Sequence, residues 1–263
     1  MASRSTDGTE EQRRRFLQVA VSGALATAGC ATTGAARSGS AGAEKGHGAA
    51  EVTPGEDLMQ EHGVVERLLL VYEESARRME QGEPMDLGLL AVAAGIFRHF
   101  VEDYHEKSEE EFVFPRLRSA GVQTSLVEVL LVQHERGRQW TAEILRKAGR
   151  GTSSELAGML RSFTRMYRPH AAQEDTVAFP AFRETLDEKS YDELGEQFEE
   201  REHRFFGEHG FENVVAEVVR IETGLGIADL SKFTVASQAP QGQEGEPAGG
   251  GRERIAMRSR TPG

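Results

Sequence analysis

One motif occurs twice in this chain and constrains its fold more than any other feature. The two stretches are YHEKSEEEFVFP, residues 104–115, and PHAAQEDTVAFP, residues 169–180. In both, a glutamate follows a histidine by four residues, a second acidic residue comes next, and Phe-Pro follows at nine and ten residues. The pairs are His105 with Glu109 and His170 with Glu174. Because each residue of an α-helix turns by about 100°, positions four apart share a face. The motif therefore predicts helices that present an imidazole beside a carboxylate.

Helical periodicity continues through the rest of the central region. Leu58, Val65, Leu69 and Tyr72 recur at intervals of seven, four and three residues, as on one stripe of a helix. Gly and Pro residues interrupt the pattern, and no alternating strand pattern is found in the sequence. The expected helices run over about residues 55–81, 86–119, 124–148, 154–186 and 191–222. Four long helices with short connections favour an all-α fold, an antiparallel four-helix bundle with an additional C-terminal helix laid across it.

The two long helices without the motif each carry a histidine well inside their length. Every helix of the expected bundle therefore offers an imidazole, and two of them also offer a carboxylate. This set suits two transition-metal ions about 3.5 Å apart, because a carboxylate has two oxygens to divide between two cations. The candidate metal ligands are His62, His105, Glu109, His134, His170 and Glu174.

A simpler explanation exists for any single copy of the motif. A His and a Glu four residues apart are often a surface pair that stabilises a helix by a few tenths of a kcal/mol. The repetition favours the metal site instead, because the copies also agree at the second acid, Glu110 and Asp175. The two histidines of each expected hairpin are also similarly spaced, 43 and 36 residues apart.

On these residues the chain resembles the hemerythrin-like family, the bacterial HHE cation-binding domains. The resemblance runs over about residues 56–223 and is strongest at the H-x-x-x-E-E-x-x-x-F-P pattern. It implies a hemerythrin-like four-helix bundle around a non-haem di-iron site with an oxo or hydroxo bridge. The six candidate ligands would hold the two iron ions, with manganese or zinc as alternatives.

One position departs from the oxygen carriers of that family. They have a second histidine one turn after that of the third helix, where this chain has Arg138. The resemblance therefore implies more open coordination positions, and favours binding of, or reaction with, O2, NO or peroxide over reversible oxygen carriage. Non-enzymatic iron storage, donation or sensing is the alternative, and a metal-free interaction domain is a third. The residues leave open whether the chain is an enzyme, and they identify no redox partner.

Several other residues have competing explanations. Glu102 and Glu200 each begin a Glu-x-x-His spacing found in ferritin-like carboxylate sites, but such a site would leave most of the candidate histidines unused. Tyr104 and Tyr167 are candidates either for hydrogen bonds to the metal ligands or for packing. The Phe-Pro pairs and Pro169 are expected to kink or end helices, because Pro lacks the N–H that a helix needs.

Both ends of the chain differ from the helical region. Residues 13–17, Arg-Arg-Arg-Phe-Leu, resemble a twin-arginine export signal, and the apolar run after them is shorter than the about 20 residues needed to span a bilayer. Segments rich in Gly, Ala and Ser cannot bury a core. We therefore expect a twin-arginine signal peptide over 1–30, a flexible tether over 31–52, the helical domain over 53–235 and a disordered tail over 236–263.

Such a signal would place the protein in the periplasm or cell envelope. Cys30, the only cysteine, follows Thr-Ala-Gly as in a lipoprotein cleavage box, whereas Ala26-Thr27-Ala28 suits an ordinary signal peptidase, so a lipid anchor at Cys30 stays open. The twin-arginine route carries folded proteins, often with a cofactor already inserted, which agrees with a metal site. The net charge of -12 argues against a nucleic-acid partner.

Overall fold

The computed structural model describes residues 52–235. All regular structure in that range is helical, without a strand, which confirms the all-α fold class. No helix within the range is long and apolar enough to cross a membrane. The expected signal peptide with Cys30, the expected tail and nearly all of the expected tether lie outside the described residues.

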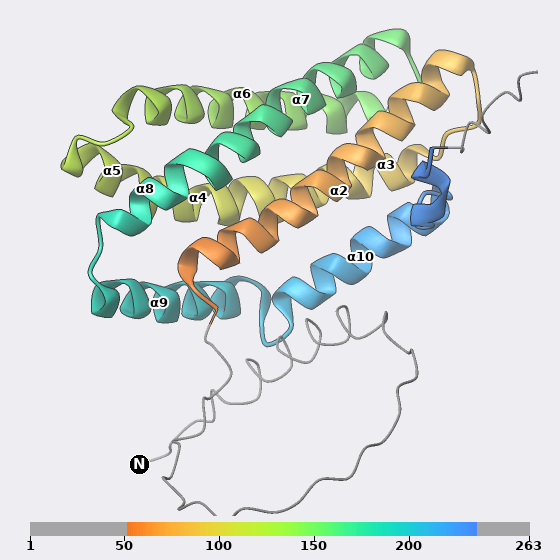
Figure 1. Cartoon of the computed structure of the whole chain (residues 1–263). Helices are drawn as coiled ribbons and strands as arrows, with labels where there is room; N and C mark the ends of the chain where they lie inside the picture. The colour runs from red at the N-terminus through yellow and green to blue at the C-terminus, as the bar shows by residue number, and fades with distance from the viewer. Residues whose placement is uncertain (1–51, 236–263) are drawn as a thin grey trace, which may run out of the picture. The chain divides into compact units, whose positions relative to one another are not determined.

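Four long helical rods make up most of the described chain (Figure 1). The first rod is α2 (Pro54–Gln81) and the third is α6 (Thr124–Ala148). The other two rods consist of several helical segments joined without a break. The second comprises α3 (Leu87–Ile96), η1 (Phe97–His105), α4 (Glu106–Ser108), η2 (Glu109–Val113) and α5 (Phe114–Ala120), and the fourth comprises α7 (Ser154–Gln173), η3 (Glu174–Ala178) and α8 (Phe179–Glu184).

Consecutive rods run in opposite directions and lie side by side (Figure 1). Helix α2 contacts α7 and the second rod, while α6 contacts α7 and α3. Each rod therefore packs along two of the other three, and α2 also contacts α9 (Glu188–Phe206) and α10 (Gly210–Gly224). Side chains from all four rods can meet between the rods, which a site built from four helices requires.

Local sequence signals set the ends of these rods. Thr53 caps α2 in a reciprocal arrangement with Glu56, and the helix ends at Gly82, whose φ of 67° is left-handed. Ser153, not Ser154, caps α7 by accepting a hydrogen bond from the N–H of Leu156 at 3.1 Å. The boundaries expected from the Gly, Pro and Ser residues are confirmed here to within a few residues.

A widened helical turn precedes each Phe-Pro pair. Pro115 has no N–H and its ring collides with the carbonyl four residues earlier, so a regular α-helical ladder cannot continue through it. Instead, the N–H of Phe114 bonds to the carbonyl of Glu109, five residues back, and that of Phe179 bonds to the carbonyl of Glu174. The rods continue past both prolines, so these prolines do not end the helices. Each of these π-helical turns begins at one of the two candidate glutamate ligands.

The single C-terminal helix expected from the sequence is wrong, because the structure has two: α9 (Glu188–Phe206) and α10 (Gly210–Gly224). Gly207 between them has φ 80° and ψ -170°, a conformation essentially confined to glycine. Gly210 allows the chain to turn closely, because a Cβ there would lie 2.5 Å from the Cβ of Phe206. Single glycines such as Gly207 and Gly210 are often tolerated inside a helix, so the pattern alone did not predict the break.

Two apolar clusters hold the rods together. The larger includes Tyr72, Phe97 and Phe163, and the smaller includes Phe114 and Phe182. Along each rod, the candidate histidine lies between residues of the larger and residues of the smaller cluster. The candidate site is thus a polar layer between two apolar ones. Separately, the described residues 229–235 belong to a second unit with one short 3-10 helix, η4 (Leu230–Phe233).

Candidate metal centre

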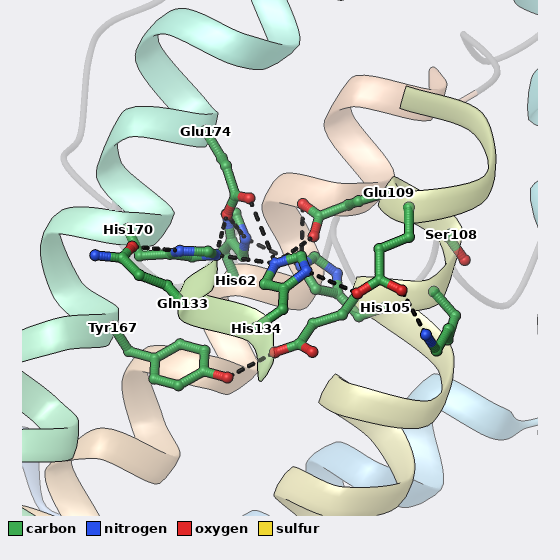
Figure 2. A network of polar contacts seen from close by, with 12 residues as sticks. His62, His105, Ser108, Glu109, Gln133, His134, Tyr167, His170 and Glu174 are labelled. Atoms are coloured by element: carbon green, nitrogen blue, oxygen red, sulfur yellow. Dashed lines mark hydrogen bonds and ion pairs between the residues drawn. The ribbon is translucent and has the colours of Figure 1, made fainter. Parts of the chain in front are cut away.

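The structure brings the six candidate ligands into one buried cluster (Figure 2). None of the six side chains belongs to a residue more than 4% exposed. They form two groups of two histidines and one glutamate, and the potential ligand atoms of each group lie within 4.8 Å of one another. One group is His62, His105 and Glu109, and the other is His134, His170 and Glu174.

Each group draws its two histidines from two neighbouring rods. His62 Nε2 lies 3.0 Å from His105 Nε2, and His134 Nε2 lies 3.2 Å from His170 Nε2. Helical spacing explains why a glutamate joins each pair, since it lies one turn beyond the second histidine on the same face. The predicted pairing of the motif residues within each helix is therefore observed in space.

Each carboxylate faces imidazoles of both groups. The two oxygens of Glu109 lie 3.5 Å from His105 Nε2 and 3.4 Å from His134 Nε2. Those of Glu174 lie 3.4 Å from His62 Nε2 and 3.8 Å from His134 Nε2. A carboxylate so placed can divide its oxygens between two cations, one in each group.

Each of the four imidazoles is held in its orientation by a polar side chain of its own. In all four histidines, Nδ1 lies within hydrogen-bond distance of a side-chain oxygen from a neighbouring rod. Such partners orient metal-binding histidines and select their tautomer. The pairs are His62 with Asp175 at 2.7 Å, His105 with Glu61 at 2.7 Å, His134 with Glu110 at 3.1 Å, and His170 with Gln133 at 2.9 Å.

Two of these four partners lie outside the repeated motif, so the sequence pattern did not reveal them. Glu61 and Gln133 each directly precede a candidate histidine, yet each bonds to the histidine of the next rod. The signal available was a Glu or Gln directly before the histidine in both hairpins. Glu110 and Asp175 were noted as a matching feature of the motif, and their role as hydrogen-bond partners emerges only from the structure.

The resulting arrangement suits cations. With a proton on Nδ1 donated outward, each Nε2 presents a lone pair to the interior. Among the described residues, none of the four oxygens of Glu109 and Glu174 has a hydrogen-bond partner. Four nitrogen lone pairs and two carboxylates therefore converge without donors, which is costly in a buried position. Imidazole and carboxylate ligands of this kind suit iron, zinc or manganese.

The pKa values of the site differ between groups of the same type. Burial raises the pKa of Glu109 well above its ordinary value, and the charge of Glu174 adds to the effect. Burial also acts on Glu174, but attraction to His170 outweighs it and lowers the pKa of this carboxyl. Burial lowers the pKa of His134 to about 4. It opposes protonation of His62 too, yet the neighbouring carboxylates of Asp175 and Glu174 raise that pKa to about 9. The surrounding side chains thus do little to offset the cost of burying an ionised Glu109. A bound cation would offset that cost.

Arg138, which stands where the oxygen carriers have a further histidine, lies beside the cluster and points to acidic residues. Its guanidinium pairs with Glu110 and lies 3.0 Å from Glu106 Oε2. Since Glu110 also bonds to His134, the arginine orients a ligand-supporting carboxylate. Arginine keeps its proton and cannot coordinate a metal, so this position contributes no ligand.

The two candidate tyrosines have different surroundings. Tyr167 donates a hydrogen bond to Glu106 at 2.6 Å, so it bonds to a carboxylate beside the site rather than to a candidate ligand. Tyr104 packs its ring against Phe205 and Phe206, with centroids 5.7 and 5.1 Å away. Tyr167 therefore joins the polar network of the site through Glu106.

The remaining histidines of the described chain lie away from the cluster. His99, His203 and His209 are exposed, and none belongs to a described group able to hold a metal. Glu102, the start of the alternative Glu-x-x-His spacing, pairs with Arg98 at 2.6 Å and belongs to no such group either. The ferritin-like alternative thus lacks a cluster within residues 52–235.

Comparison with known proteins places these observations in a family. A family model for the hemerythrin HHE cation binding domain matches residues 53–182. An uncharacterized protein of Mycobacterium tuberculosis and one of Mycobacterium bovis are each 40% identical to this chain over 236 residues, which cover 84% of this chain and 90% of theirs. No solved structure matches. The matched region contains all six candidate ligands and ends before α9.

Proposed function

Because this chain belongs to the hemerythrin HHE cation-binding family, we propose that it is a di-iron protein that binds or reacts with O2, NO or peroxide. The four rods form the hemerythrin-like four-helix bundle, with α9 and α10 packed outside it. One iron ion would be held by His62, His105 and Glu109 and the other by His134, His170 and Glu174, with each glutamate close enough to imidazoles of both groups to be shared.

One observation carries this proposal. Four imidazoles turn their Nε2 atoms inward while Nδ1 is bonded outward, and two carboxylates without hydrogen-bond partners among the described residues lie between them. A surface pair or a packed core histidine needs no such set of oriented partners. Two cations would satisfy every inward-facing atom, because each carboxylate reaches both groups.

The bound iron pair would supply coordination of a small ligand and electrons for its reduction. The chain's own contribution is to hold the ligands in place, to exclude bulk water with two apolar clusters, and to keep the imidazoles in one tautomer. Arg138 in place of a further histidine leaves a four-His, two-Glu ligand set. That smaller set supports ligand reaction over reversible oxygen carriage.

The same proposal extends to the location of the protein. The Arg-Arg-Arg-Phe-Leu segment of residues 13–17 supports export by the twin-arginine route to the periplasm or cell envelope. Cys30 remains a candidate for a lipid anchor. Expression of the full chain and fractionation of the cells would test this part, and full-length protein retained in the cytoplasm would contradict it.

Metal analysis with an absorption spectrum tests the core of the proposal. Protein reconstituted anaerobically with iron and then oxidised should contain about two ions per chain and absorb in the near ultraviolet, with a shift on addition of azide. One ion or none would refute the di-iron assignment. Manganese and zinc reconstitutions in parallel would show whether the site prefers iron.

A measurement of peroxide turnover and iron release distinguishes a reactive centre from iron storage or donation. Purified di-iron protein supplied with an external electron donor should consume peroxide over many turnovers, with two electrons and two protons taken up for each peroxide reduced to two waters. Stoichiometric release of iron to a chelator, without turnover of peroxide, would favour storage or donation instead. The two results separate a reactive centre from a reservoir while leaving the ligand assignment intact.

A further inference from the structure

A small cavity lies next to the six-residue cluster, on the side opposite the two carboxylates. Glu109 and Glu174 follow their histidines by four residues, whereas the cavity-lining Val101 and Tyr167 precede the same histidines by four and three. Along a helix these offsets lie one turn above and one turn below the imidazole. Figure 2 shows Glu109 and Glu174 on one side of the imidazoles and Tyr167 on the other.

The cavity is too small for an organic substrate. Its volume is about 10 Å³, which is the lower limit for holding one water molecule. Three of the candidate histidines form one wall, and Val65, Val101 and Ala171 form apolar walls. The remaining lining residues are Glu106 and Tyr167, and all eight lining residues are buried. A ligand of very few atoms would therefore touch the imidazole layer and just two other polar side chains.

Glu106 holds the Tyr167 hydroxyl in one orientation. The hydroxyl donates to Glu106 Oε1 at 2.6 Å, and the other oxygen of Glu106 lies 3.0 Å from Arg138 Nη2. The hydroxyl hydrogen is thus committed to the carboxylate. A phenolic oxygen that donates its hydrogen keeps lone pairs that accept hydrogen bonds. Tyr167 therefore offers the cavity an acceptor.

Gly137 provides the space for that hydroxyl. A Cβ on this residue would overlap the Tyr167 hydroxyl oxygen and lie 2.9 Å from Cζ. Gly137 is buried in the interior of α6, where glycine destabilises a helix relative to alanine. The equivalent position in the first rod, three residues after His62, is Val65. The chain thus departs from its own repeat at the residue that accommodates the tyrosine.

We propose that this cavity binds a small oxygen ligand that carries a proton, such as hydrogen peroxide, and that the Tyr167 oxygen accepts the hydrogen bond from that proton. The inference rests on the proposed function, because it needs iron beside the cavity to hold the other end of the ligand. Ligands that lack a proton, such as azide or NO, reach the same metal position but gain nothing from Tyr167.

Affinities for peroxide and azide, measured by absorbance on rapid mixing with iron-loaded protein, test the proposal. Tyr167→Phe should weaken peroxide binding by about 2- to 10-fold, the range for loss of one hydrogen bond, and leave azide affinity unchanged. Tyr104→Phe is the matched control, since Tyr104 is equally buried but does not line the cavity. It should change neither affinity. Metal content should stay at the wild-type value in both variants, whereas Tyr167→Phe should lower the melting temperature, because buried Glu106 loses the hydrogen bond from Tyr167.

Two further substitutions test the geometry without removing the hydroxyl. Gly137→Ala displaces the Tyr167 oxygen and should weaken peroxide binding more than azide binding. Val65→Ile narrows the cavity and should weaken both ligands, whereas Val65→Ala should not weaken either. Each variant is compared at equal iron content, so that a loss of metal is not mistaken for a loss of ligand.

The outcomes separate this inference from the proposed function. If wild-type protein takes up no iron pair, the proposed function fails and the inference fails with it. If the iron pair forms and binds both ligands, but Tyr167→Phe leaves the ratio of peroxide to azide affinity unchanged, the inference alone is overturned. Undiminished binding of both ligands to Val65→Ile would likewise show that the cavity is not the ligand position.

Discussion

The two helical hairpins, α2 to α5 and α6 to α8, carry the same types of candidate metal ligand. They differ in the residues that hydrogen-bond to those ligands. Both supply two histidines and one glutamate, and both place a π-helical turn before Phe-Pro. In the first hairpin, His105 bonds outward to the carboxylate of Glu61. In the second, His170 bonds outward to the amide of Gln133. A charged partner makes an imidazole a stronger ligand than a neutral one does, so the two metal positions should not be equivalent.

The hairpins also differ on the cavity side of the imidazoles. Relative to the second histidine, the first hairpin has Glu102 three residues before and Glu106 directly after. At the same offsets, the second hairpin has Tyr167 and Ala171. Of these acids, Glu106 accepts a hydrogen bond from Tyr167 of the other hairpin, whereas Glu102 pairs with Arg98 of its own hairpin. The candidate metal ligands are thus alike in the two hairpins, whereas the residues on the cavity side differ between them.

The largest expected effect comes from removing the bridging carboxylates one at a time. Glu109→Gln and Glu174→Gln should each lose metal and lower the melting temperature of the iron-loaded protein by about 5–10 °C. The reasons are that metal at 100 times its Kd contributes about 2.7 kcal/mol, and that each kcal/mol corresponds to about 2–4 °C for a domain of this size. Metal analysis and calorimetry measure both quantities.

The metal-free forms of the same variants should differ from each other. Burial raises the pKa of Glu109, so its ionised form is costly and Glu109→Gln should not lower the melting temperature without metal. Attraction to His170 outweighs burial and lowers the pKa of Glu174, so the ionised form is stabilised in the folded protein. Glu174→Gln should therefore lower the melting temperature without metal. Equal shifts of the two metal-free variants would contradict the asymmetry between the two carboxylates.

A smaller effect is expected from exchanging the outer partners. Glu61→Gln should weaken metal binding in the His62 and His105 group by about 10-fold, and Gln133→Glu should strengthen binding in the other group. Stepwise competition with a chelator on zinc-loaded protein measures both positions. Gln197→Glu, on an exposed part of α9, is the control for added charge. Equal affinities in all of these proteins would show that the outer partners do not distinguish the two positions.

The smallest predicted effect concerns pH and Glu102. Burial raises the pKa of this carboxyl to about 7, even though Arg98 acts in the opposite direction. A folded-state pKa above the unfolded value means that stability is lost as the pH rises from about 4.5 to about 7. Glu102→Gln should therefore be more stable than wild type at pH 8, by about 1 kcal/mol once screening through the partly exposed Arg98 is allowed for, and not at pH 4. Denaturant unfolding at the two pH values measures the difference in unfolding free energy between the variant and wild type. An equal gain in stability at pH 4 and pH 8 would refute the predicted pH dependence.

Most of the helices and all six candidate ligands followed from the sequence. The all-α fold class is confirmed and the four-helix bundle stays a prediction, whereas the single C-terminal helix is wrong because Gly207 divides it. The six side chains meet as expected, while their role as metal ligands stays a prediction. The expectation that Pro115 kinks or ends its helix did not include the wider turn that begins at Glu109. Periodicity indicates which residues share a face of a helix. It does not indicate how the backbone hydrogen bonds rearrange around a proline.

The sequence by itself determined that each rod presents a histidine, and in two rods a glutamate, on a single face. That information is local, because helical geometry relates residues four apart wherever the helix lies. The tertiary structure alone decided that Glu61 supports His105 rather than its neighbour His62, and that Gly137 makes room for Tyr167. Those contacts depend on how the rods are rotated and shifted against one another. Packing of the two apolar clusters sets that arrangement, and no spacing within one helix records it.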